Sequence, residues 1–141
     1  MNYKISQAEN PATEELQILW DGLTRHAAPQ LGDDANTPLT FFLRDADGVI
    51  VGGVHGNYSK VGWLYISTLW VSDDVRKEGY GTKLMQQMEE AAMAAGCTNV
   101  YLDTFSFQAP EFYKKLGYTV FGVLEDFPVG HSRIFLHKHL I

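Results

Sequence analysis

The sequence of 141 residues predicts an α/β fold built on a mixed β-sheet. Segments with apolar residues at helical spacing alternate with short segments rich in β-branched and aromatic residues. The Asp47-Gly48 turn separates residues 39–45 from 49–59 and indicates a β-hairpin. The predicted order is β-α-β-β-β-α-β-α-β-β. No internal repeat or linker interrupts it, so we expect one domain over residues 1–141.

The elements around the hairpin follow from local patterns. A short strand is expected at residues 2–6. Apolar residues at helical spacing predict a helix from Thr13 to about Ala27, and a polar connector with Gly and Pro is expected at 28–38. The strand predicted at 61–71 is apolar on both faces, which favours a central place in the sheet.

The second half of the chain begins with a predicted helix from Tyr80 to Ala95, which carries one apolar stripe. Gly96 follows as its expected end, because glycine adopts the left-handed conformation that closes many helices. The remaining predicted elements are a strand at 99–105, a short helix at 109–116 and two strands at 118–124 and 132–140.

Composition excludes several classes of function. The formal charge of −6 argues against a general nucleic-acid-binding protein, which needs a basic surface. Cys97 is the single cysteine, so an intramolecular disulfide and a cysteine-built zinc site are excluded. His137 and His139 alternate on a terminal strand without an evident metal partner, and we expect no metal site. No signal sequence or membrane-length apolar run is present, which favours a cytoplasmic protein that does not bind membranes.

The stretch VRKEGYGTKLM, residues 75–85, indicates an anion-binding site. Gly79 and Gly81 bracket the start of a helix, where backbone N–H groups have no intrahelical partner and the helix dipole is positive. Arg76 and Lys77 add mobile positive charge, and Thr82 adds a hydroxyl. The alternative is a glycine-rich turn that only needs room.

Two nucleotide-binding motifs fail on spacing. A Walker loop requires a glycine five residues before Gly81 and a lysine directly after it, whereas Thr82 precedes Lys83 here. A dinucleotide fingerprint requires a third glycine where Leu84 stands. The remaining pattern is Arg76-x-x-Gly79-x-Gly81 after an apolar strand.

That pattern resembles the pyrophosphate loop of the GNAT superfamily of N-acetyltransferases. The segment SFQAPEFYKKLGY, residues 106–118, is similar to a second signature of the same family. The positions in register there are Ala109, Tyr113, Leu116, Gly117 and Tyr118. The resemblance implies a mixed, mostly antiparallel sheet flanked by helices, with splayed fourth and fifth strands, and acetyl-CoA as the co-substrate.

The resemblance also implies roles for individual residues. The pantetheine arm is expected on the exposed edge of the strand at Leu69–Val71, and the pyrophosphate on the backbone N–H groups of residues 76–82. Tyr113 corresponds to the general acid that protonates the departing thiolate, and a phenol keeps its proton at a pH where a thiol ionises. The expected cofactor-binding residues are Leu69, Trp70, Val71, Arg76, Lys77, Glu78, Gly79, Tyr80, Gly81, Thr82, Ser106 and Phe112.

The sequence leaves the general base open, because Tyr65 stands where some family members carry a glutamate. The candidates are Asp103, Glu125, Asp126, His131 and a water held by backbone carbonyls.

The acceptor, the activity and the assembly also have alternatives. We expect a small-molecule amine as acceptor, with a protein N-terminus or lysine as the other option. A non-catalytic acyl-CoA sensor and a phosphate-binding regulatory domain are the rival functions. A homodimer formed through the terminal strands is a further expectation from the family.

Overall fold

The computed structural model describes residues 2–32 and 36–140. The chain divides into two compact units, residues 1–34 and residues 35–141. The expectation of one domain over residues 1–141 therefore stays a prediction. The predicted connector at 28–38 includes residues 33–35, which lie outside the described residues.

The first unit contains one helix, α1 (Thr13–Leu31), preceded by residues without regular structure. The strand predicted at residues 2–6 is wrong, because the structure has no regular element there. The helix also runs past the predicted end near Ala27, through Pro29. Gly32 ends it with a positive φ of 67°, and its N–H donates to the Ala28 carbonyl at 2.7 Å.

The second unit is built on a six-stranded sheet with the order β1-β2-β3-β4-β6-β5. β3 and β4 are parallel, whereas every other neighbouring pair is antiparallel. The strands are β1 (Thr37–Arg44), β2 (Ile50–Tyr58), β3 (Trp63–Val71), β4 (Asn99–Phe105), β5 (Thr119–Glu125) and β6 (Ser132–His139). This mixed α/β arrangement confirms the predicted fold class, and every predicted strand after the first is present.

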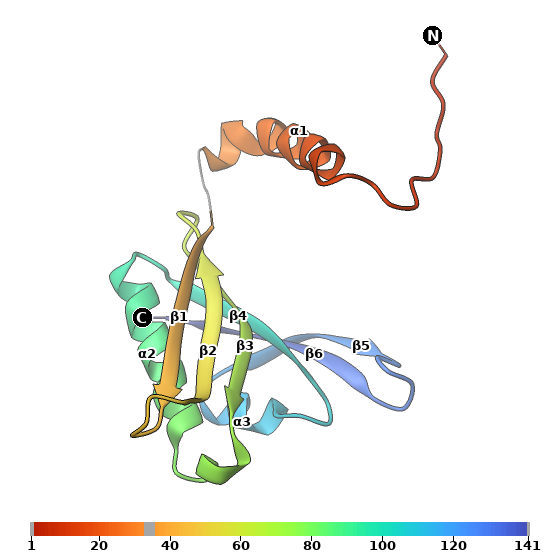
Figure 1. Cartoon of the computed structure of the whole chain (residues 1–141). Coiled ribbons are helices and arrows are strands. Elements are labelled where there is room, and N and C mark those ends of the chain that lie inside the picture. Colours follow the sequence, from red (N-terminus) through yellow and green to blue (C-terminus); the bar gives the residue numbers. More distant parts are fainter. Residues whose placement is uncertain (1, 33–35, 141) are drawn as a thin grey trace. The chain divides into compact units, whose positions relative to one another are not determined.

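Helices connect these strands and cover one face of the sheet. They are α2 (Tyr80–Ala94) and α3 (Pro110–Lys115), and a short 3₁₀ turn, η1 (Asp73–Val75), precedes α2. α2 packs on β1, β2 and β3 (Figure 1). Its apolar stripe buries Leu84, Met85 and Met88 in the core, and Gly96 follows the helix at φ 96° as predicted.

The parallel pairing between β3 and β4 covers only the first part of each strand. It ends at Ile66 and Leu102, although β3 continues to Val71 and β4 to Phe105. The two strands then diverge, as Figure 1 shows. The last residues of β3 therefore keep an unpaired edge toward β4, which is the splay that the family resemblance implies.

Candidate functional site

A cavity of about 790 Å³ opens where β3 and β4 diverge. The end of β3, the loop before α2, the first turn of α2, the end of β4 and α3 surround it. Its lining residues are Leu69, Trp70, Val71, Val75, Arg76, Lys77, Gly79, Tyr80, Gly81, Thr82, Thr104, Phe107, Gln108, Ala109, Phe112 and Tyr113. The size suits a cofactor-length molecule.

The loop that enters α2 has the backbone of an anion site. Lys77 and Gly79 have positive φ values of 73° and 81°, and Gly79 is the N-cap of the helix. No side chain caps this end, and the N–H of Lys83 makes the first intrahelical bond, to Gly79 O at 3.1 Å. The preceding N–H groups of the first turn are thus left for a ligand. A non-glycine residue at positive φ, such as Lys77, is uncommon and often marks a functional loop.

The two glycines of the loop are needed for different reasons. A Cβ on Gly79 would meet no atom within 4 Å, so the left-handed backbone explains glycine there. A Cβ on Gly81 would lie 3.3 Å from Cζ of Phe112, which lines the same cavity. Gly81 therefore lets the aromatic ring lie against the first turn of α2.

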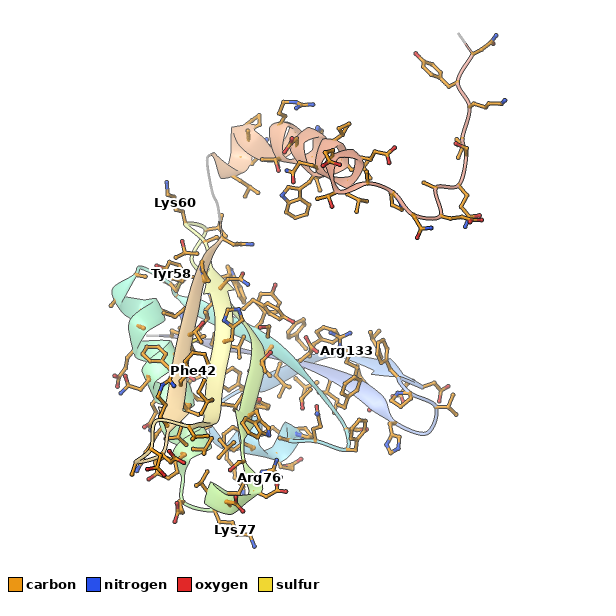
Figure 2. All side chains as sticks on the ribbon, in the orientation of Figure 1. Phe42, Tyr58, Lys60, Arg76, Lys77 and Arg133 are labelled. Carbon is orange, nitrogen blue, oxygen red and sulfur yellow. The ribbon has the colours of Figure 1, made fainter. Side chains whose placement is uncertain are left out.

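Arg76 differs from the mobile charge that the sequence predicts. Its Nε donates to the carbonyl oxygen of Val71 at 2.9 Å, and its Nη1 pairs with Asp73 Oδ1 at 2.8 Å. The side chain thereby connects the end of β3 to the following loop. Figure 2 shows Arg76 and Lys77 together at this end of the sheet.

The open edge of β3 offers backbone groups from alternate residues. The N–H of Ser72 donates to Val51 O in β2, and backbone groups alternate sides along a strand. The backbone N–H and C=O groups of Leu69 and Val71 therefore point to the open edge, whereas those of Trp70 point to β2. Arg76 already binds the Val71 carbonyl, so the remaining edge groups are the Val71 N–H and both groups of Leu69.

Tyr113 lies on α3, and its side chain is buried at the cavity wall. Its ring makes T-shaped contacts with the rings of Phe112 and Tyr118, with centroids 5.1 and 5.9 Å apart. Burial, followed by the negative charge of Asp103, raises the pKa of Tyr113 to about 12. The phenol consequently keeps its proton throughout the neutral and mildly alkaline range.

Asp103 is the first residue of β4 beyond its pairing with β3. Its Oδ1 accepts from Arg133 Nε at 2.8 Å, and its Oδ2 accepts from the Tyr65 hydroxyl at 3.2 Å. Burial, followed by the Asp103 charge, raises the pKa of Tyr65. The hydrogen bond to Asp103 raises the pKa of Arg133, so the carboxylate is held between two protonated donors.

All residues predicted to bind the cofactor line the cavity except Glu78 and Ser106. The Ser106 hydroxyl accepts from the N–H of Ser132 at 2.9 Å and joins the end of β4 to β6. Sequence reasoning missed five lining residues: Val75, Thr104, Phe107, Gln108 and Ala109. Their signal is position, because Val75 ends η1 and the other four lie at the end of β4 or between β4 and α3, next to the splay.

Two other features are absent from the described part of the chain. Residues 2–32 and 36–140 contain no group of three or more histidine, cysteine, aspartate or glutamate side chains placed to hold a metal ion. No helix in that part of the chain is long and apolar enough to span a membrane.

Comparison with known proteins gives the family of the chain. The model of the acetyltransferase (GNAT) family matches residues 3–118. An acetyltransferase of Agrobacterium fabrum is 30% identical over 138 residues, which cover 98% of each chain. The blasticidin-S acetyltransferase of Streptomyces morookaense is 34% identical over 94 residues, 66% of this chain and 68% of that protein.

A solved structure gives the same result for the fold. The crystal structure of an acetyltransferase from Bacillus cereus superposes with a TM-score of 0.87 at 38% identity, covering 96% of this chain and 98% of the other. With the family model matched over most of the sequence, the chain belongs to the GNAT family and is an N-acetyltransferase.

Proposed function

We propose that the protein transfers the acetyl group of acetyl-CoA to a primary amine of a small molecule by direct attack, with Tyr113 as general acid. The observation that carries the proposal is one cavity that joins the uncapped start of α2, the open edge of β3 and a protonated tyrosine. The blasticidin-S acetyltransferase supports the small-molecule class, since its name records such a substrate.

The residues present fit the pyrophosphate, the pantetheine arm and the thioester of acetyl-CoA. The free N–H groups at the start of α2 suit the pyrophosphate, and the backbone edge at Leu69 and Val71 suits the amides of the pantetheine arm. An N–H on this edge also suits a developing oxyanion on the thioester carbonyl. Backbone dipoles provide this binding, which explains how a chain with a charge of −6 accommodates a polyanion.

Tyr113 completes the proton balance of the reaction. The neutral amine attacks the thioester carbon, a C–N bond forms, and the C–S bond breaks. At pH 8 a group with a pKa of about 12 is ionised in only about one molecule in 10⁴, so the phenol is in the acid form. It gives its proton to the sulfur as the C–S bond breaks, and the phenolate then regains a proton from water, which has taken the proton of the amine. We assign the amine proton to water, since Asp103 is held by two donors and no carboxylate lies on β3.

A screen of amines with acetyl-CoA, read by release of free CoA thiol, tests the proposal. We expect acetyl-CoA to raise the Tm and at least one small-molecule amine to release thiol at a steady rate. A raised Tm without turnover on any amine would favour an acyl-CoA sensor. No effect of acetyl-CoA on the Tm would remove the cofactor assignment itself.

A further inference from the structure

Arg133 lies on β6 (Figure 2). This strand pairs with the edge of β4 that faces away from β3. Within the described part of the chain, its guanidinium group makes a hydrogen bond through Nε only. Its Nε donates to Asp103, and among the described residues its Nη1 and Nη2 atoms have no hydrogen-bond partner. Its side chain is 31% exposed, so these two nitrogens are accessible. The outer edge of a guanidinium is the fork that binds a carboxylate in a bidentate manner.

Two aromatic rings fix the orientation of this guanidinium. Its central carbon lies 5.2 Å from the ring centroid of Phe127 and 5.3 Å from that of Phe135. Stacking of this kind restricts the rotamers of a long side chain before any ligand arrives. The two rings and the bond to Asp103 occupy the faces and the Nε side of the guanidinium, so its Nη edge is the part that a ligand can reach.

An aromatic path connects Arg133 to the cofactor cavity. Phe127 contacts Phe105, with centroids 5.8 Å apart, and Phe105 stacks on Phe107 at 5.1 Å. Phe107 lines the cavity. The Asp103 charge also acts on Tyr113, so the cluster lies within electrostatic range of the phenol. An acceptor with an apolar body thus has a continuous surface between the guanidinium and the reacting end.

A purely structural ion pair between β4 and β6 would explain the bond of Arg133 to Asp103. It would not explain the two stacked rings or the free Nη edge. The stacked, singly bonded guanidinium and its aromatic path to the cavity are features of a binding position. Asp103 then acts as a positioning residue that fixes Arg133.

We propose that Arg133 binds a carboxylate of the acceptor, so that the substrates are amines that carry a carboxylate in the same molecule, such as amino acids. This inference rests on the proposed function and names its substrate class. The aromatic surroundings favour members of that class with an apolar side chain or an apolar spacer.

Matched acceptors test the proposal: L-phenylalanine against L-phenylalaninamide, and 4-aminobutyrate against its amide. Amidation also changes the pKa of the amine, so the readout is the ratio of kcat/KM for acid over amide, compared between wild type and variants. We expect at least a tenfold fall of this ratio in Arg133→Gln, a smaller fall in Arg133→Lys, and an unchanged acetyl-CoA effect on the Tm.

Arg44→Gln is the matched control. Arg44 also stacks on a phenylalanine, Phe42 at 5.4 Å, and its Nη1 donates to a backbone oxygen, but it does not line the cavity. Its acid-to-amide ratio should equal that of wild type. The same ratio in Arg133→Gln and wild type, or wild-type turnover confined to amines without a carboxylate, would overturn the proposal.

If both Arg133 variants fail to fold, the comparison of acid and amide acceptors in the wild type alone tests the proposal. In that case a higher kcat/KM for each amide than for its acid, after correction to the neutral amine, counts against the proposal, and the reverse order supports it. Failure here is distinct from failure of the proposed function, because acetyl-CoA would still raise the Tm and other amines would still release thiol.

Discussion

Gly81→Val should largely abolish the effect of acetyl-CoA on the Tm while leaving the fold intact. A Cβ at this position meets Phe112 at 3.3 Å, closer than ordinary van der Waals contact, and valine adds two methyl groups beyond it. Either the methyl groups or the displaced ring must enter the cavity where the first turn of α2 offers its N–H groups. Loss of two charge-assisted hydrogen bonds, at about 1.5 kcal/mol each, weakens binding about 100-fold.

The magnitude in the melting experiment follows from mass action. At a concentration of 100 Kd, acetyl-CoA stabilises the wild type by about 2.7 kcal/mol. The entropy of unfolding of a 141-residue chain is about 0.3 kcal/mol/K, so the Tm rises by about 9 °C. At the same concentration the variant gains only about 0.4 kcal/mol, or about 1 °C.

Differential scanning fluorimetry with and without acetyl-CoA measures both shifts. Gly122→Val is the control, because a Cβ there meets only Phe135 Cβ at 3.9 Å and the residue does not line the cavity. Its shift should match the wild type. A folded Gly81→Val protein with the full 9 °C shift would refute the assignment of the loop to the cofactor.

Three further predictions concern the acid, the base and the core. Tyr113→Phe should retain acetyl-CoA affinity within a few-fold and lower kcat by about 10²–10⁴, the range for losing a general acid; an unchanged kcat when chemistry limits the rate would remove the phenol from the mechanism. In wild type, kcat/KM should rise with pH toward the pKa of the acceptor amine and show no fall up to pH 10, because Tyr113 loses its proton only near pH 12. Amide substitution of Asp103, Glu125 or Asp126 should leave the slope of this rise intact, and a limb near pH 6–7 that disappears in one variant would identify a carboxylate base. Glu89→Gln should lower the free energy of unfolding in urea by about 3 kcal/mol, because buried Glu89 accepts from Tyr118 and Lys138; the exposed Glu111→Gln should cost less than about 1 kcal/mol, and equal losses would show that burial is unimportant here.

The sequence predicts the part of the fold that local patterns determine. The apolar stripe before Gly96 and the Asp47-Gly48 turn each encode their element within a few residues, and both elements are present. The strand predicted at residues 2–6 is not present, and a local pattern could not decide this, because strand pairing is not a local property. The same reasoning explains the missed bond between Asp103 and Arg133, two residues far apart in sequence that become neighbours only when β4 pairs with β6.

In the candidate site, too, local patterns predict some features, whereas others depend on contacts that form only in the folded chain. The left-handed backbone of Gly79 could be predicted, because glycine at the start of a helix is a local pattern, whereas the contact of Gly81 with Phe112 forms only in the folded chain. The role of a side chain could not be predicted, because it depends on which partner lies nearest in the folded chain. The hydrogen bond that the Ser106 hydroxyl accepts from the backbone of β6 is of this kind, because Ser132 is 26 residues away in the sequence. A contact of Ser106 with the cofactor stays a prediction.

Arg76 shows that the geometry of a cation, and not only its charge, can determine anion binding. Its guanidinium uses Nε on the Val71 carbonyl and Nη1 on Asp73, so it fixes the end of β3 relative to the loop that carries Lys77 and Gly79. A lysine retains the charge but has one compact ammonium, which cannot bond both partners in this planar arrangement. If Arg76 acts by fixing the loop, Arg76→Lys and Arg76→Gln should weaken acetyl-CoA binding to a similar degree, about tenfold, in isothermal titration calorimetry. If the residue acts as a mobile charge toward the phosphates, the lysine variant should bind like wild type while the glutamine variant does not, and that outcome would reject the role drawn from the two hydrogen bonds.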